Sequence, residues 1–262
     1  MKRRISVGKK TIPGIFTIFN FFFGFLAIIV ASQGYFSKAA WLILGAALFD
    51  ALDGKLARFF GTSSKFGIEF DSIADLVSFC TAPAVIVYFA YVRDLHPILA
   101  AAISFVPLIA GGFRLARFNI QALEAPQRFF VGLSSPAFAV TIASFLLFNF
   151  DYYDSPGDSR IALPLVFILS FLMVSHIRYP KIPNIGKGWR GKTITAALLV
   201  GLGVIVIWKN IVLFPMTILY VSWGMIDTVI HPDKYEIELK IKEAANTNPG
   251  NQSWYHRRHK KL

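Results

Sequence analysis

The stretch Asp50-Ala-Leu-Asp53-Gly54-Lys-Leu-Ala57-Arg58 is followed, after eight residues, by Gly67-Ile-Glu-Phe-Asp71-Ser-Ile-Ala-Asp75. Four aspartates therefore stand among apolar residues, where an ionised group costs free energy unless it is paired or solvated. The first two are three residues apart and the last two are four apart, so each pair shares one face of a helix. Two such faces brought together form a cluster of carboxylate oxygens, the ligands that hard divalent cations prefer.

The connection between the two acidic segments is short and polar. Residues 59–66 include Gly61, Thr62, Ser63, Ser64 and Lys65. A turn of this length joins two antiparallel helices, so both acidic faces are expected at one surface. Four carboxylates at close range repel one another, and two divalent cations would balance their charge. A salt-bridge cluster that includes Arg58 is the structural alternative.

Blocks of apolar residues dominate the rest of the chain. Of its 262 residues, 55% are hydrophobic, and most of the apolar blocks approach the roughly 20 residues that cross a bilayer core. The eight expected spans are 12–32, 38–60, 68–92, 97–116, 130–150, 161–177, 193–208 and 211–230. The pattern predicts an all-α, polytopic membrane helix bundle with about eight transmembrane helices. This membrane domain covers 12–230, between a basic N-terminus (1–11) and a basic tail (231–262).

The distribution of basic residues predicts the orientation. With a cytoplasmic N-terminus, 23 of the 27 Lys and Arg residues fall in inner segments, a strong positive-inside asymmetry. Both termini and the acidic cluster are then cytoplasmic in an integral membrane protein. The net charge of +12 is explained by basic loops that face anionic lipid headgroups, so no nucleic-acid partner is expected. Cys80 is the single cysteine, which excludes an intrachain disulfide.

An oxygen-ligated site with two metals suits displacement at phosphorus, where cations neutralise phosphate charge and orient the reacting group. A carboxylate there can also take a proton from an attacking hydroxyl, and the spacing nominates Asp71 or Asp75 equally. The small residues Gly54 and Ala57 lie on the acidic face of their helix. They allow either a close helix–helix contact or a ligand against the backbone.

The acidic stretch resembles the signature of the CDP-alcohol phosphotransferase family, D-x2-D-G-x2-A-R-x8-G-x3-D-x3-D, at every defined position. The resemblance implies two divalent cations, Mg²⁺ or Mn²⁺. Asp50, Asp53 and Asp71 would hold one, and Asp50, Asp71 and Asp75 the other. It also implies that Asp75 is the base that deprotonates the acceptor alcohol. The positions that would line the cytidine nucleotide are Gly54, Ala57, Arg58 and Gly67.

A second resemblance concerns the acceptor. The stretches Gly112-Phe-Arg114-Leu-Ala-Arg117-Phe-Asn119 and Gly132-Leu-Ser-Ser-Pro136-Ala are similar to segments of bacterial phosphatidylserine synthases, a branch of the same family. This implies transfer of the phosphatidyl group from CDP-diacylglycerol to L-serine, with release of CMP, by a homodimer among membrane lipids. A guanidinium recognises a carboxylate well. Candidate residues for acceptor or phosphate binding are Arg114, Arg117, Asn119, Lys65 and Ser63.

Two alternatives to this function remain open at the level of sequence. The same chemistry can act on another acceptor, such as glycerol 3-phosphate or an inositol phosphate, because the signature is shared across acceptors. A cation transporter could use the four carboxylates as its ion site, although the matched Gly, Ala and Arg positions have no clear use in one.

Overall fold

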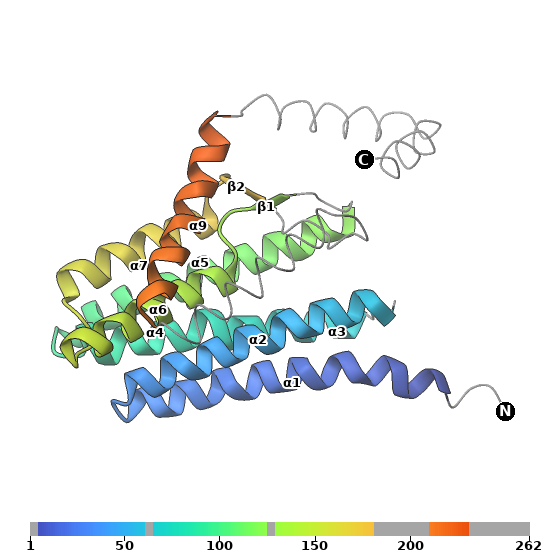
Figure 1. The fold of residues 1–262 in the computed structure, drawn as a ribbon, viewed down its shortest axis with the longest axis horizontal. Helices are drawn as coiled ribbons and strands as arrows, with labels where there is room; N and C mark the ends of the chain where they lie inside the picture. The colour runs from blue at the N-terminus through green and yellow to red at the C-terminus, as the bar shows by residue number, and fades with distance from the viewer. Residues whose placement is uncertain (1–4, 61–64, 125–128, 181–209, 231–262) are drawn as a thin grey trace.

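The computed structural model describes residues 5–60, 65–124, 129–180 and 210–230, which form a helical bundle with one small sheet (Figure 1). The elements in chain order are α1 (Ile5–Ser32), α2 (Phe36–Phe60), α3 (Lys65–Asp75), η1 (Leu76–Thr81), α4 (Ala82–Val87), η2 (Tyr88–Val92), α5 (Pro97–Glu124), β1 (Phe129–Val131), α6 (Ser135–Tyr153), α7 (Ser159–Val174), β2 (Arg178–Pro180) and α9 (Asn210–Ile230). The elements η1 and η2 are π-helical. The start of α1, the end of α2, the start of α3 and the end of α5 lie at the same end of the bundle (Figure 1).

The helical class expected from the apolar blocks is confirmed. Among the described residues, three helices are long and apolar enough to cross a membrane, over Gly14–Ser32, Phe66–Val92 and Pro97–Ile120. The second half of α2 carries charged side chains, and Ser159–Val174 and Val212–Thr228 form shorter apolar helices. The expected span 193–208, the N-terminal residues 1–4 and the tail 231–262 lie outside the described residues.

The departure from an all-helical fold is a two-stranded antiparallel sheet. Strand β1 pairs with β2 in the register Phe130 to Tyr179. Gly132 follows β1 with φ +80°, and a Cβ there would lie 2.3 Å from the carbonyl oxygen of Met173. Only glycine tolerates this combination of left-handed backbone and close approach. The sheet therefore holds the N-terminal end of α6 close to the C-terminal end of α7.

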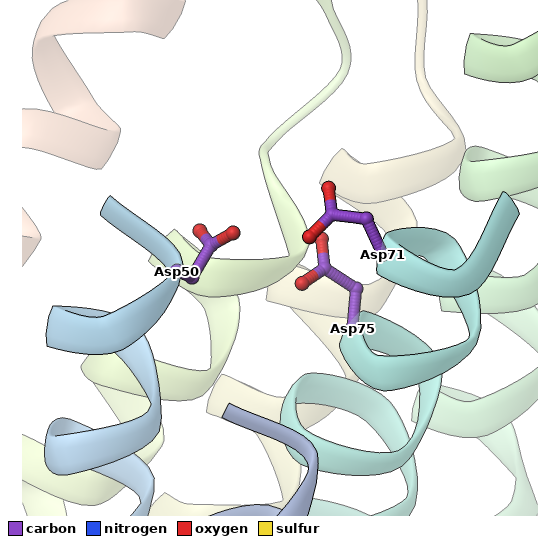
Figure 2. A group of neighbouring side chains, drawn as sticks. All are labelled: Asp50, Asp71 and Asp75. Carbon is purple, nitrogen blue, oxygen red and sulfur yellow. The ribbon is translucent and has the colours of Figure 1, made fainter. Parts of the chain in front are cut away.

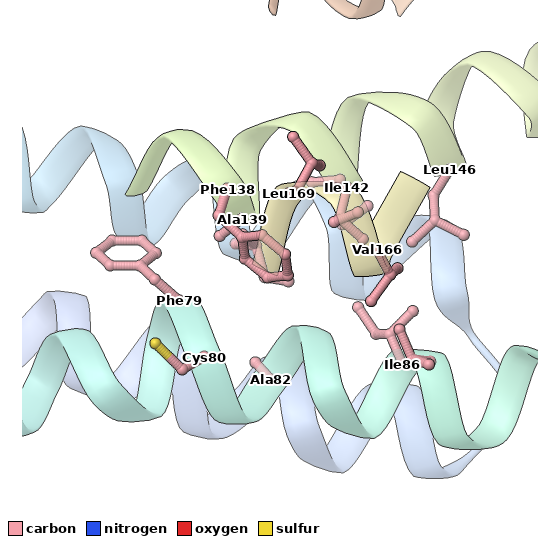
Figure 3. Packing of buried hydrophobic residues seen from close by; sticks show 14 of the residues in the cluster. Phe79, Cys80, Ala82, Ile86, Phe138, Ala139, Ile142, Leu146, Val166 and Leu169 are labelled. Atoms are coloured by element: carbon pink, nitrogen blue, oxygen red, sulfur yellow. The ribbon is translucent and has the colours of Figure 1, made fainter. Parts of the chain in front are cut away.

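The hydrophobic core lies between α4, α6 and α7 and continues to α1 and α2 (Figure 3). Phe79, Ile86, Phe138 and Leu146 are among its fully buried side chains. Small residues of α1 and α2, such as Ala27 and Ala46, are also completely buried. Small side chains let helix backbones approach closely, which is how helices pack when lipid removes most of the hydrophobic driving force.

The π-helix η1 begins directly after Asp75 and packs closely against a glycine of α1 and a glycine of α5. A Cβ on Gly24 of α1 would lie 2.1 Å from the Ser78 hydroxyl oxygen, and one on Gly111 of α5 would lie 2.1 Å from the Cys80 sulfur. Short π-helical turns inside helices occur frequently at functional sites. Here the close packing on both sides fixes the segment that carries Asp75.

We expect Gly111→Val to destabilise the protein by about 1–3 kcal/mol, because the added carbons overlap the Cys80 side chain in a packed helix contact. Thermal unfolding of the purified protein in detergent measures this effect. Gly112→Val is the matched control, since no atom of another described element lies within 4 Å of its Cβ position. Equal melting temperatures for the two variants would contradict the described contact between α5 and η1.

Candidate functional site

Three of the four aspartates come together in space. Asp50 in the second half of α2 faces Asp71 and Asp75 of α3, and one carboxylate oxygen from each lies within 4.8 Å of the others (Figure 2). This trio is the second of the two metal sets implied by the family signature. Three anionic oxygens at this separation repel strongly unless a cation lies between them, and the donors suit Mg²⁺ or Mn²⁺.

Asp53 lies outside this trio but close to it. Its side chain is 8% exposed, and one of its oxygens accepts a hydrogen bond from the Thr17 hydroxyl of α1. Its other oxygen, Oδ1, is buried with no hydrogen-bond partner among the described residues. A buried carboxylate oxygen without a partner carries a desolvation cost that a bound cation would remove. The residues present therefore fit a divalent metal at this site.

A second residue of α1 holds the proposed base. Asn20 is completely buried, and its Nδ2 donates a hydrogen bond of 3.2 Å to Oδ1 of Asp75. The Ser78 hydroxyl of η1 donates to the Asn20 carbonyl oxygen at 2.9 Å. The amide Oδ1 of Asn20 is buried without a partner among the described residues. Helix α1 thus fixes the carboxylates of Asp53 and Asp75 through two polar side chains one turn apart.

The surroundings of Gly54 distinguish between the two alternatives for this face of α2, a helix–helix contact and a bound ligand. In the described part of the chain, no atom from outside its own helix turn lies within 4 Å of the position that a Cβ would occupy on Gly54. The described helices therefore do not pack against this position, which favours a ligand over a helix–helix contact. The side chains of Ala57, Arg58 and Lys65, and the whole of Ser63, lie outside the described residues.

Arg114 of α5 lies on the inner side of the bundle. It is only 6% exposed, and its Nη1 donates a hydrogen bond of 2.9 Å to the Ser135 hydroxyl at the start of α6. Its Nε is buried with no partner among the described residues. Asp50 and Asp75 attract it electrostatically. No carboxylate in the described part of the chain lies within the 4.0 Å of a salt bridge to it.

Arg117, one turn further along α5, has a different environment. Its Nη1 donates to the carbonyl of Val174 at 2.8 Å, and its Nη2 donates to the carbonyls of Val131 at 2.8 Å, Met173 at 3.2 Å and Ser175 at 3.3 Å. These acceptors are the last carbonyls of α7 and the end of β1. A cation at a helix C-terminus is favourable because the exposed carbonyls there carry partial negative charge. The structure therefore engages Arg117 in holding α5, α7 and the small sheet together.

Asn119 links α3 to α5 outside the trio of carboxylates. Its Oδ1 accepts a hydrogen bond of 3.1 Å from the Ser72 hydroxyl, and its Nδ2 donates to Glu69 at 3.5 Å. Glu69 belongs to no metal-type cluster among the described residues. Gly67 is half-buried near the start of α3.

Strand β2 packs against α9 through Tyr179. The Tyr179 ring contacts Tyr220 with 5.9 Å between centroids, and Gly224 leaves room for it. Burial raises the pKa of Tyr179 to about 12, so its hydroxyl stays protonated at neutral pH.

Sequence reasoning assigned no role to Thr17, Asn20 or Ser135. The first two are polar residues three apart in an otherwise apolar helix, which is a readable sign that they share a functional face. Ser135 stands beside the N-cap Ser134, whose hydroxyl accepts from the Ala137 amide at 3.3 Å. No feature of the sequence indicates that Ser135 accepts a hydrogen bond from Arg114.

Comparison with known proteins gives a consistent result. Residues 10–228 match the family described as CDP-alcohol phosphatidyltransferase. The chain is 39% identical over 174 residues to a CDP-diacylglycerol–serine O-phosphatidyltransferase of Helicobacter pylori, covering 66% of this chain and 73% of that protein. It is 36% identical over 179 residues to an archaetidylserine synthase of Methanothermobacter thermautotrophicus, covering 67% and 72%. A Mycobacterium tuberculosis protein with the same name as the first is 27% identical over 255 residues, covering 92% and 88%. These matches confirm the resemblance found in the sequence.

Proposed function

Because this chain belongs to the CDP-alcohol phosphatidyltransferase family, we propose that it transfers the phosphatidyl group of CDP-diacylglycerol to L-serine and releases CMP. The observation that carries the chemistry is the trio of Asp50, Asp71 and Asp75, with carboxylate oxygens within 4.8 Å of one another. The names of the relatives support serine as the acceptor, and they differ in the lipid. The family match favours this reading over a cation transporter.

In the proposed reaction, Asp75 accepts the proton of the serine hydroxyl as its oxygen attacks the lipid-bearing phosphorus. A new P–O bond to serine forms, the P–O bond to the CMP oxygen breaks, and CMP leaves with that electron pair. Asn20 holds the Asp75 carboxylate in position through the 3.2 Å hydrogen bond. A base fixed within reach of the proton that it takes is the geometric condition for general-base catalysis.

Two divalent cations, Mg²⁺ or Mn²⁺, would supply charge neutralisation at the phosphates. Asp50, Asp71 and Asp75 would hold one, and Asp50, Asp53 and Asp71 the other. Thr17 orients Asp53 for that purpose by donating to one oxygen and leaving Oδ1 free of protein partners among the described residues. The nucleotide would lie along Gly54, Ala57, Arg58 and Gly67.

We also propose that the site faces the cytoplasm of a bacterial inner or plasma membrane. The strong bias of Lys and Arg toward the inner segments supports this orientation. The proposal also includes about eight spans with both termini inside and a membrane domain over 12–230. We propose that the protein acts as a homodimer. Cross-linking and mass measurement in native lipid would test the homodimer.

The acceptor is tested with purified protein and CDP-diacylglycerol, with CMP release as the readout. We expect release with L-serine and little or none with glycerol 3-phosphate or an inositol phosphate. Release with glycerol 3-phosphate and none with serine would leave the family chemistry intact but overturn serine as the acceptor.

Gly54→Val tests the nucleotide face. We expect it to preserve the melting temperature, since no atom of another described element lies within 4 Å of the Gly54 Cβ position. It should raise the KM for CDP-diacylglycerol by at least about tenfold, because a branched side chain would occupy the proposed path of the ligand. Gly112→Val is again the control, with equally open surroundings on α5. An unchanged KM in the Gly54 variant would indicate that the nucleotide binds elsewhere.

A further inference from the structure

Two buried polar atoms near Asp75 have no hydrogen-bond partner among the described residues: Nε of Arg114 and Oδ1 of Asn20. They have opposite character, because the first is a donor on a cation and the second is an acceptor on a neutral amide. The orientation of the amide follows from its neighbour. An ionised carboxylate only accepts hydrogen bonds, so the Asn20 atom facing Asp75 is Nδ2 and the unpaired atom is Oδ1.

Burial makes both unpaired atoms costly to leave without a ligand. Asn20 is 0% exposed and Arg114 is 6% exposed. A buried guanidinium is normally matched by an anion in direct contact, whereas in the described part of the chain Arg114 contacts the neutral hydroxyl of Ser135 and lies over the Phe118 ring, 6.0 Å from its centroid. The attraction of Asp75 acts on it from beyond 4.0 Å, so the two side chains are not in direct contact.

Arg117 differs from Arg114 because its hydrogen-bond donors already have partners. It lies on the same helix and has the same side chain, but four main-chain carbonyls already accept its hydrogen bonds. Of these two arginines, Arg114 is thus the one with a buried donor that no described residue uses.

We propose that Arg114 and Asn20 select an α-amino acid as the acceptor. The Arg114 guanidinium binds the carboxylate of the amino acid, and the Asn20 carbonyl accepts a hydrogen bond from its ammonium group. The hydroxyl then lies against Asp75, which Asn20 holds through its other amide atom. This inference rests on the proposed transfer to serine and assigns the residues that recognise the acceptor. Serine carries a carboxylate, an ammonium and a hydroxyl on two adjacent carbons, so one molecule can reach all three groups.

The test combines variants with acceptor analogues, using the full-length protein in lipid nanodiscs and CMP release as the readout. L-Serine methyl ester lacks the carboxylate charge, and glyceric acid has a hydroxyl in place of the ammonium. We expect the wild-type protein to show a KM about 10- to 100-fold higher for each analogue, the range for one charge-assisted hydrogen bond. Arg114→Gln should raise the KM for serine by a similar factor and reduce the penalty for the ester to about twofold. Asn20→Leu should reduce the penalty for glyceric acid in the same way.

Two control variants separate recognition from folding. Arg117→Gln should lower the melting temperature, because it removes bonds to α7, and still discriminate serine from its ester. Asn149→Leu replaces another buried asparagine, on α6, whose Nδ2 donates to the Phe145 carbonyl of its own helix; it should still discriminate serine from glyceric acid. If Arg114→Gln does not fold, Arg114→Lys is the alternative, because it keeps the charge but loses the planar fork of donors. Its KM for serine should lie between that of the wild-type protein and the about 10- to 100-fold higher value expected for Arg114→Gln.

Each outcome has a defined meaning. An ester penalty that persists in the Arg114 variants overturns the proposal for Arg114. So does a raised KM for CDP-diacylglycerol with an unchanged KM for serine, which would identify a donor phosphate as its ligand. A glyceric acid penalty unchanged in Asn20→Leu overturns the role of Asn20. Absence of CMP release from the wild-type protein with serine would instead refute the proposed function.

Discussion

Asp75→Asn is expected to slow CMP release by about 10²- to 10⁴-fold, the range for loss of a positioned general base. The side chain keeps its size and can still contact Asn20, but its amide cannot take the proton of the acceptor. The effect should fall on kcat at saturating serine and CDP-diacylglycerol.

The control for this variant is Glu69→Gln on the same helix. Glu69 contacts Asn119 at 3.5 Å and lies outside the carboxylate trio, so its activity should stay within a few-fold of wild type. Retention of near wild-type kcat in Asp75→Asn would refute Asp75 as the base and leave Asp71 as the candidate.

Removal of divalent metal should abolish CMP release, and addition of Mg²⁺ or Mn²⁺ should restore it. Asp50, Asp71 and Asp75 repel one another without a cation, so metal binding also favours the folded protein. At a metal concentration of 100 times the Kd, the expected stabilisation is about 2.7 kcal/mol. Chelation followed by titration with each metal measures both activity and melting temperature.

Asp71→Asn provides the matched test of the ligand set. It should move the metal titration to higher concentration and reduce the thermal stabilisation by metal, while Glu69→Gln should leave both unchanged. Full activity after exhaustive chelation would contradict a metal-dependent transferase.

The sequence alone was sufficient to predict the helical class, the pairing of two acidic helices and the family. These features depend on local information, since spacings of three and four residues determine which side chains share a helix face. The same spacing places Asp50 opposite Asp71 and Asp75 once a short turn is assumed. It does not show that Asp53 turns toward Thr17, because that contact joins residues 36 positions apart.

The different roles of Arg114 and Arg117 also required the structure. Both are arginines on one helix turn, and the sequence allows either to bind a carboxylate or a phosphate. Their roles separate because the end of α7 and the small sheet, far along the chain, supply carbonyls to one and not to the other. The sequence also does not predict the close packing of the π-helical turn after Asp75, because that packing involves glycines from two other helices.

The packing of η1 has a practical consequence for spectroscopy. Cys80 is the single cysteine of the chain, it is completely buried, and α5 lies directly against its sulfur. Thiol-directed reagents need an accessible thiolate, so this residue should not react in the folded protein. The natural sequence can therefore serve as a background for attaching spin labels or fluorophores at newly introduced cysteines, without first replacing Cys80.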